Sequence, residues 1–184
     1  MVDQAKLTTV EEFERFIALP ENADRLFELI DGEIVEKVPT EEHSIVAGNI
    51  FAALRAFVKP RNLGRVLFEA RHQLIDDTRN SHLPDVEFTR AERVKPVVKR
   101  GGIEHLPDLA VEVKSPNDRL AAMRRKAVYY LDNGVSLVWL VYPDTQRIDV
   151  WTTETSETLV MGDMLDGGDV LPGFTMSLED VFAE

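Results

Sequence analysis

Residues 107–114 read Pro107-Asp108-Leu109-Ala110-Val111-Glu112-Val113-Lys114, with charged side chains at alternate or fourth positions of an otherwise apolar stretch. Successive side chains of a β-strand point to opposite faces of the sheet, so Asp108, Glu112 and Lys114 share one face while the leucine and the valines share the other. Three charged groups on one strand face are costly to bury without partners or a metal ion. The charged face of this strand is therefore the first candidate for a functional site.

The composition of the chain is that of one globular domain. Its 184 residues are 44% hydrophobic and 29% charged, and a single hydrophobic core usually serves about 100 to 200 residues. We therefore predict a single domain over residues 1–184. Because the chain has no cysteine, a metal ion would have to be bound by oxygen or imidazole ligands.

The prediction of where the protein is located rests on two kinds of segment, a membrane helix and a secretory leader. No apolar run approaches the about 20 residues that a membrane helix needs. The N-terminal residues Met1-Val2-Asp3-Gln4 do not have the basic and apolar regions of a secretory leader. We expect a cytoplasmic protein with no membrane partner.

Charge is distributed unevenly along the chain. The formal net charge of -12 argues against a nucleic-acid partner, because phosphates repel an acidic protein. Residues 90–126, however, carry ten Lys/Arg against five Asp/Glu, a net charge of +5, so the remainder carries -17. The basic residues gather in sequence around the charged strand. They suit a DNA-binding surface, and they equally suit a solvated or self-associating surface.

Hydrophobic periodicity and turn signals predict helices and strands around one mixed sheet, which is an α+β or α/β fold. Asp31-Gly32 is a strong hairpin signal, and Ser115-Pro116-Asn117-Asp118 supplies N-cap residues for a helix. In order, we predict a helix over 9–19, hairpin strands over 25–30 and 33–38, a helix over 41–59, strands over 64–75, 83–89 and 106–114, a helix over 119–131, strands over 135–142 and 147–152, and a helical turn near 178–182.

The charged strand face offers the groups of a hydrolytic metal site. Glu112 and Lys114 would emerge about 7 Å apart, and a carboxylate that binds a hard cation beside an ammonium group that orients water suits phosphodiester hydrolysis. Asp108 lies about 13 Å along the strand from Glu112, too far to share one ion. Asp85, which opens the preceding strand, can meet Glu112 across the roughly 4.8 Å between adjacent strands. Alternatively, these acids form an ion network with neighbouring Arg and Lys side chains.

The sequence also resembles a known family. Asp85, followed 27 residues later by Glu112-Val113-Lys114, is similar to the signature of the PD-(D/E)XK nucleases, and the chain resembles the Uma-type restriction endonuclease family within that superfamily. The resemblance rests on Phe27-Glu28-Leu29-Ile30-Asp31-Gly32-Glu33-Ile34-Val35, His43, Leu83-Pro84-Asp85-Val86, Pro107-Asp108-Leu109-Ala110-Val111-Glu112-Val113, Ser115-Pro116, Lys126, Tyr130, Gly134-Val135, Trp139-Leu140-Val141 and Leu171-Pro172-Gly173-Phe174.

The resemblance implies a restriction endonuclease-like fold, with a central mixed β-sheet flanked by helices and preceded by an N-terminal helix and hairpin. It implies an endonuclease that hydrolyses phosphodiester bonds of DNA with Mg²⁺ or Mn²⁺. Asp85 and Glu112 would be metal ligands, and Lys114 would position or activate water. In many members of the family the position of Lys114 is apolar, and a helix lysine that matches Lys126 serves instead. Because this chain has both lysines, the identity of the catalytic lysine stays open.

Three further residues are candidates for the site. Nucleases of this fold often bring another acid from the hairpin region, so Glu28 is either an outer metal ligand or an exposed strand residue. His43, near the start of the long helix, either contacts a phosphate or water or else caps or packs locally. Asp108 is either a structural acid or a ligand of a second ion.

Two other functions stay open beside the leading hypothesis of a metal-dependent nuclease that acts on DNA. One is a non-catalytic nucleic-acid-binding or assembly module on a nuclease fold, such as a homodimer, in which the acids form salt bridges. The net charge of -12 is in keeping with such a module. The other is a metal-dependent hydrolase of small phosphate esters.

Overall fold

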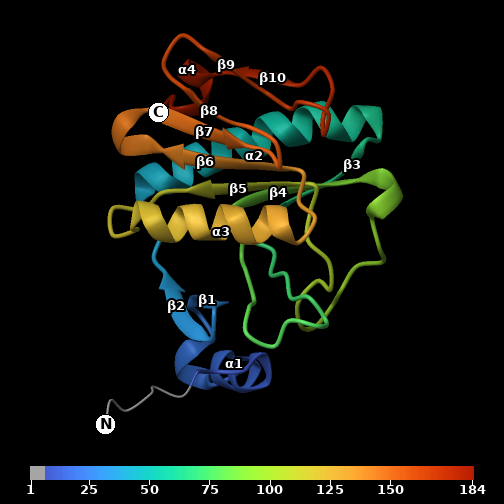
Figure 1. The fold of residues 1–184 in the computed structure, drawn as a ribbon, viewed down its shortest axis with the longest axis vertical. Helices are drawn as coiled ribbons and strands as arrows, with labels where there is room; N and C mark the ends of the chain where they lie inside the picture. Colours follow the sequence, from blue (N-terminus) through green and yellow to red (C-terminus); the bar gives the residue numbers. More distant parts are fainter. Residues whose placement is uncertain (1–6) are drawn as a thin grey trace. The chain divides into compact units, whose positions relative to one another are not determined.

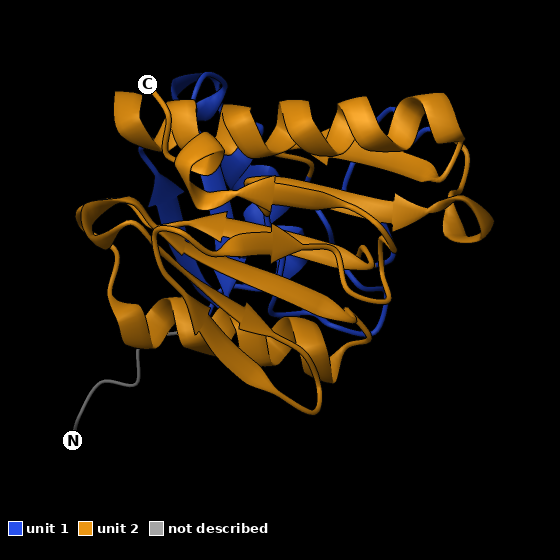
Figure 2. Ribbon diagram, turned by 90° about the horizontal axis from the view of Figure 1, so that it is seen from above, with its two compact units in different colours: residues 1–38, 71–83, 97–105 blue, residues 39–70, 84–96, 106–184 orange. Residues whose placement is uncertain are grey.

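The computed structural model describes residues 7–184, and the contacts among them form two compact units. Unit 1 contains residues 7–38, 71–83 and 97–105, and unit 2 contains residues 39–70, 84–96 and 106–184 (Figure 2). The expectation of a single domain remains a prediction. The residues used for the leader prediction, Met1–Gln4, lie outside the described part of the chain.

Unit 1 begins with a short capped helix, α1, over Val10–Ile17. The Thr9 hydroxyl accepts a hydrogen bond from the Glu12 N–H, and the Glu12 carboxylate accepts one from the Thr9 N–H. These two bonds form a capping box. A 3₁₀ turn over Pro20–Asn22 follows, so the helix ends two residues earlier than expected because the chain must leave the helical conformation before the proline.

The predicted β-hairpin is confirmed in unit 1. β1, Leu26–Ile30, pairs antiparallel with β2, Glu33–Lys37. Asp31 and Gly32 form the two-residue turn with φ angles of 50° and 81°. This left-handed turn matches the twist of the strands, and Asp-Gly adopts it readily.

The strand predicted over 64–75 is correct only in its first half. β3 covers Gly64–Phe68 and ends where Glu69 takes a φ of 48°, outside the extended region. From Arg71 on, the segment belongs to unit 1, where His72 forms isolated bridges with His82 and Ile103.

Unit 2 is built on a six-stranded mixed sheet in the order β3-β4-β5-β6-β7-β8. Within this sheet β5 and β6 run parallel and the other neighbours run antiparallel, so a crossover has to join β5 to β6. The predicted α+β fold class with a central mixed sheet is confirmed. The remaining strands are β4 Val86–Arg90, β5 Leu109–Val113, β6 Leu137–Tyr142, β7 Arg147–Trp151 and β8 Ser156–Leu159.

The helices α2 and α3 lie on opposite sides of this sheet (Figures 1 and 2). α2, Glu41–Arg61, begins after its N-cap Thr40 and ends at Asn62, which has a left-handed φ of 54°. Pro60 lies inside its last turn, so the predicted end at residue 59 is two residues early.

The predicted N-cap of α3, Leu120–Asp132, is wrong. Arg119 is the N-cap, and its side chain makes no capping hydrogen bond. The Asp118 carboxylate accepts a hydrogen bond from the Ser115 N–H instead and closes a turn before the helix. α3 is the crossover between β5 and β6.

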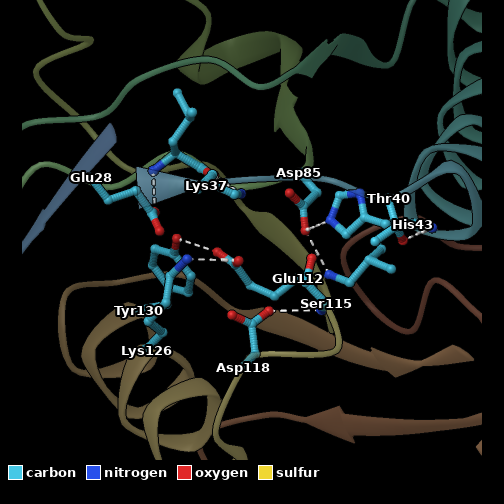
Figure 3. A network of polar contacts seen from close by, with 12 residues as sticks. Glu28, Lys37, Thr40, His43, Asp85, Glu112, Ser115, Asp118, Lys126 and Tyr130 are labelled. Carbon is cyan, nitrogen blue, oxygen red and sulfur yellow. Dashed lines mark hydrogen bonds and ion pairs between the residues drawn. The ribbon is translucent and has the colours of Figure 1, made fainter. Parts of the chain in front are cut away.

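The sheet of unit 2 separates an apolar side from a polar side. Leu109, Val111 and Val113 of β5 pack in the hydrophobic core that also contains Ile50 and Leu54 of α2. Glu112 points away from that core, toward α3 (Figure 3). The alternation predicted for residues 107–114 is therefore confirmed within β5.

The C-terminal segment closes the apolar side of unit 2. It contains the two-stranded sheet of β9, Met164–Asp166, and β10, Thr175–Ser177, and the short helix α4, Leu178–Val181. Its side chains Leu165 and Phe174 join the hydrophobic core of α2. Among residues 7–184, no helix has the length and apolar character needed to cross a membrane.

Candidate active site

The pairing of β4 with β5 brings Asp85 beside Glu112. Val86 is the register partner of Val111, in an antiparallel ladder, and one step further sets Asp85 opposite Glu112. The Asp85 N–H donates to the Val111 carbonyl over 3.0 Å. The predicted adjacency of the two strands is thus confirmed, and both acids lie at the same end of the strand pair.

The Asp85 carboxylate is buried, with 1% of the residue exposed. Its Oδ2 accepts a hydrogen bond of 2.6 Å from the Val113 N–H and lies 3.2 Å from Nε2 of His43. His43 reaches it from the first turn of α2, where the Thr40 hydroxyl accepts a hydrogen bond from the His43 N–H (Figure 3). The backbone of His43 therefore takes part in the helix cap, while its imidazole contacts Asp85.

The Glu112 carboxylate is held from α3. Its Oε2 lies 2.7 Å from Nζ of Lys126, and its Oε1 accepts a 2.7 Å hydrogen bond from the Tyr130 hydroxyl. Lys126 and Tyr130 are four residues apart and so lie on one face of the helix. Figure 3 shows the Glu112 side chain extending toward these two groups, whereas Asp85 extends toward His43.

The two candidate lysines have different neighbours. Lys126 contacts Glu112, as described above, and the side chains of this pair are 9% and 6% exposed. β5 ends at Val113, and Nζ of Lys114 lies 3.3 Å from Oδ2 of Asp144 and 3.4 Å from the Ser115 carbonyl. The structure therefore brings Lys126, and not Lys114, into contact with Glu112.

Asp108 lies at the opposite end of β5 from Glu112. Its Oδ1 pairs with Nη1 of Arg93 over 2.7 Å, and its Oδ2 accepts a 2.8 Å hydrogen bond from the Arg90 N–H. These contacts fix the loop after β4 to the start of β5. A role for Asp108 as a ligand of a second metal ion stays a prediction.

Glu28 belongs to unit 1 and is buried there, with 3% of the residue exposed. Its Oε1 accepts a 2.7 Å hydrogen bond from the Leu83 N–H, and Nζ of Lys37 donates to the Leu83 carbonyl over 2.8 Å. Nδ1 of His82 lies 3.9 Å from the same Oε1 atom. Glu28 is thus not an exposed strand residue, and its role as an accessory metal ligand stays a prediction.

The oxygen donors of Asp85 and Glu112 fit a hard divalent cation. Mg²⁺ is usually bound through one or two carboxylates and keeps several water ligands. Within residues 7–184, no group of three or more His, Cys, Asp or Glu side chains is arranged to hold a metal ion. The carboxylate pair therefore suits an ion completed by water or phosphate oxygens, and it does not suit a structural ion enclosed by four protein ligands.

Tyr130 is the residue of this cluster to which the sequence analysis gave no role. It is fully buried, with 0% exposed. The signal that could have identified it is its position four residues after Lys126 on a predicted helix. A phenol placed one helical turn from a candidate catalytic lysine has to find a hydrogen-bond partner when it is buried.

The central mixed sheet flanked by helices is a nuclease-like fold. The crystal structure of a putative nuclease from Anabaena variabilis ATCC 29413 has a similar fold, with a TM-score of 0.79, 25% sequence identity, and coverage of 95% of this chain and 97% of that chain. The chain belongs to the Uma2 family, described as putative restriction endonucleases, whose model matches residues 10–179. The resemblance noted in the sequence is thereby confirmed. No curated protein matches the sequence.

Proposed function

We propose that the protein is a Mg²⁺- or Mn²⁺-dependent endonuclease that hydrolyses phosphodiester bonds of DNA. The observation that carries this proposal is the buried contact between Lys126 and Glu112, beside Asp85 on the neighbouring strand. Two carboxylates at one end of a strand pair, with a lysine of α3 in contact with one of them, suit metal-assisted phosphodiester hydrolysis. Membership of a family described as restriction endonucleases supports the same reaction.

Asp85 and Glu112 would hold the ion through their carboxylate oxygens. A divalent ion at such a site stabilises the charge that develops on the phosphate and lowers the pKa of water. His43 and the Val113 N–H both contact Oδ2 of Asp85. They would therefore keep that carboxylate in a fixed orientation, which metal sites generally need.

Lys126 is the lysine that we assign to the reaction. Its ammonium group contacts Glu112, and in the reaction it would orient a water molecule or a phosphate oxygen through its N–H donors. Lys114 is assigned to the ion pair with Asp144. Asp108 and Glu28 are assigned positioning roles, on the Arg93 loop and on Leu83 respectively.

DNA is proposed as the substrate from the family and from the local charge. Residues 90–126 carry a net charge of +5 in a chain of net charge -12, and basic groups near a cleavage site attract the phosphate backbone. A homodimer is the assembly that we propose for double-strand cleavage, because each chain offers one pair of carboxylates.

The experiment that tests this proposal is cleavage of supercoiled plasmid DNA by the purified chain with Mg²⁺, with Mn²⁺ and with a chelator. We expect cleavage with either ion, none with the chelator, and a loss of at least about a hundredfold in Glu112→Gln. Thermal denaturation of Glu112→Gln checks that the variant is folded. Intact supercoiled, linear and single-stranded DNA after incubation of the wild type with either ion would contradict the proposal.

A non-catalytic binding or assembly module is the second candidate. It is favoured by the fact that Asp85 and Glu112 already have protein partners, which form an ion network without a metal. DNA binding of equal affinity with and without chelator, together with no cleavage, would support this module. Hydrolysis of small phosphate esters with no cleavage of DNA would instead indicate a small-molecule phosphoesterase.

A further inference from the structure

We propose that Tyr130 is a positioning residue that fixes the orientation of the Glu112 carboxylate for metal binding. The inference rests on the proposed function, because it assigns Glu112 to a metal ion. It adds to that function a residue that does not touch the ion or the substrate and acts through Glu112.

Both carboxylate oxygens of Glu112 contact side chains of α3. Lys126 contacts Oε2 and Tyr130 donates to Oε1, each over 2.7 Å. With 5% of Glu112 and none of Tyr130 exposed, solvent water cannot readily replace the phenol as a donor. The rotation of the carboxylate is therefore set by two side chains from one helix (Figure 3).

Lys126 alone would fix this rotation poorly. An ammonium group is a compact charge with three equivalent donors on a flexible stem, so it can contact either carboxylate oxygen. The Tyr130 hydroxyl sits on a rigid ring that is buried between α3 and the sheet, and it has one proton to donate. The phenol therefore selects Oε1 and leaves Oε2 for the lysine.

The hydrogen bond from Tyr130 does not compete with an ion for Glu112. A carboxylate has about four lone-pair positions on its two oxygens, so a hydrogen bond from the phenol to Oε1 does not by itself prevent the carboxylate from binding an ion. Partners of this kind behind a metal ligand typically contribute about ten- to a hundredfold to metal affinity.

Tyr142 offers a matched control in the same unit. Its hydroxyl donates to Oδ2 of Asp149 over 3.0 Å, so it also forms a tyrosine–carboxylate hydrogen bond. Burial and this hydrogen bond raise the pKa of Tyr142, so its hydroxyl stays protonated at neutral pH. Removing that hydroxyl makes the same chemical change without altering a contact of Glu112.

The test is the affinity of the protein for Mn²⁺, measured by calorimetry without DNA in the wild type, Tyr130→Phe and Tyr142→Phe. Phenylalanine keeps the ring and its packing, and circular dichroism checks the fold of each variant. We expect Tyr130→Phe to weaken Mn²⁺ binding about ten- to a hundredfold. We expect Tyr142→Phe to stay within about twofold of the wild type.

Equal Mn²⁺ affinity in Tyr130→Phe and the wild type would overturn the inference, even if the variant melts at a lower temperature. Weakening of the same size in Tyr142→Phe would also overturn it, because the effect would then be a general one. If the wild type binds Mn²⁺ but does not cleave DNA, the nuclease proposal fails while the affinities still decide the role of Tyr130. If the wild type does not bind Mn²⁺, both proposals are wrong.

Discussion

Asp108 and Glu112 lie four residues apart at the two ends of β5, and the protein holds them in different ways. Asp108 pairs with Arg93, whose side chain is 37% exposed, and with a backbone N–H. Glu112 pairs with Lys126 and Tyr130, which are both buried. Two carboxylates at the ends of one strand thus have different surroundings. Asp108 connects a loop to the strand, whereas Glu112 belongs to a buried cluster of charged and polar side chains.

Both carboxylates are buried, and the physical difference between the two ends is the exposure of the cation: the Arg93 side chain is 37% exposed and the Lys126 side chain is 9% exposed. An ion pair whose cation is partly exposed is screened by water, so its charge attraction contributes little free energy. A buried pair costs desolvation energy that its attraction only partly returns, so it is weak evidence of a role in stability. The Glu112 end therefore calls for a functional explanation, whereas the Asp108 end has a structural one.

The largest expected effect is at the Glu112 end, where Lys126→Met and Lys114→Met can be compared. We expect Lys126→Met to slow DNA cleavage by about a hundredfold or more, because removing one positioned donor from a reacting site typically costs about that much. Lys114→Met, which breaks a contact with the exposed Asp144 side chain, should stay within about threefold of the wild type. Initial rates of plasmid cleavage under single-turnover conditions measure both.

The opposite ranking of the two lysines would make Lys114 the catalytic residue. Lys126 would then be only the partner of Glu112. The melting temperatures of both variants show whether a lower cleavage rate is caused by unfolding.

At the Asp108 end we expect a loss of stability and not of catalysis. Asp108→Ala removes the acceptor of the Arg90 N–H and the partner of Arg93, so unfolding should become easier by about 1 to 3 kcal/mol. Urea denaturation measures this change, and the cleavage rate per folded molecule should stay within about twofold. Arg93→Ala, which breaks the same contact from the other side, should shift stability in the same direction.

A different result would identify Asp108 as a metal ligand. In that case Asp108→Ala would abolish cleavage at unchanged stability, and Arg93→Ala would leave cleavage intact. The two ends of β5 would then belong to one extended metal site.

The smallest effect is expected for a pair on the surface, Arg25 with Glu36, whose side chains are both exposed. The hydrogen bond from Arg25 lowers the pKa of the Glu36 carboxyl below its ordinary value of 4.5. Its stabilisation is therefore present above that value and is lost as the pH falls through the lowered pKa. Arg25→Gln should lower the melting temperature slightly at about pH 7 and less at about pH 3.5. A larger difference at the acidic pH would contradict this interpretation.

The strand over Leu109–Val113 could be predicted from the sequence because alternation is a local property with a fixed period. Asp85 could be found by taking two consecutive strands to be neighbours, and the hairpin at Asp31-Gly32 was predictable from its turn residues. The choice between the lysines was not, because it depends on β5 ending at Val113 and on Asp144 lying within reach of Lys114.

Contacts between distant segments also lay beyond the sequence. His43 and Asp85 are 42 residues apart, and only the packing of α2 against the sheet brings the imidazole to the carboxylate. The ion pair between Asp108 and Arg93 depends on the direction of the turn after β4, which no local sequence pattern specifies. Tyr130 is the exception, since its spacing from Lys126 could have been used.

The parallel pairing of β5 and β6 has a consequence for how the candidate site is built. Parallel neighbours need a connecting crossover, and here that crossover is α3, which carries Lys126 and Tyr130. One contiguous β–α–β unit over residues 109–142 thus contains Glu112, Lys126 and Tyr130. The relative positions of these three side chains therefore depend on how one helix packs against the two strands that it connects. Asp85 comes from outside this unit and depends on the separate pairing of β4 with β5.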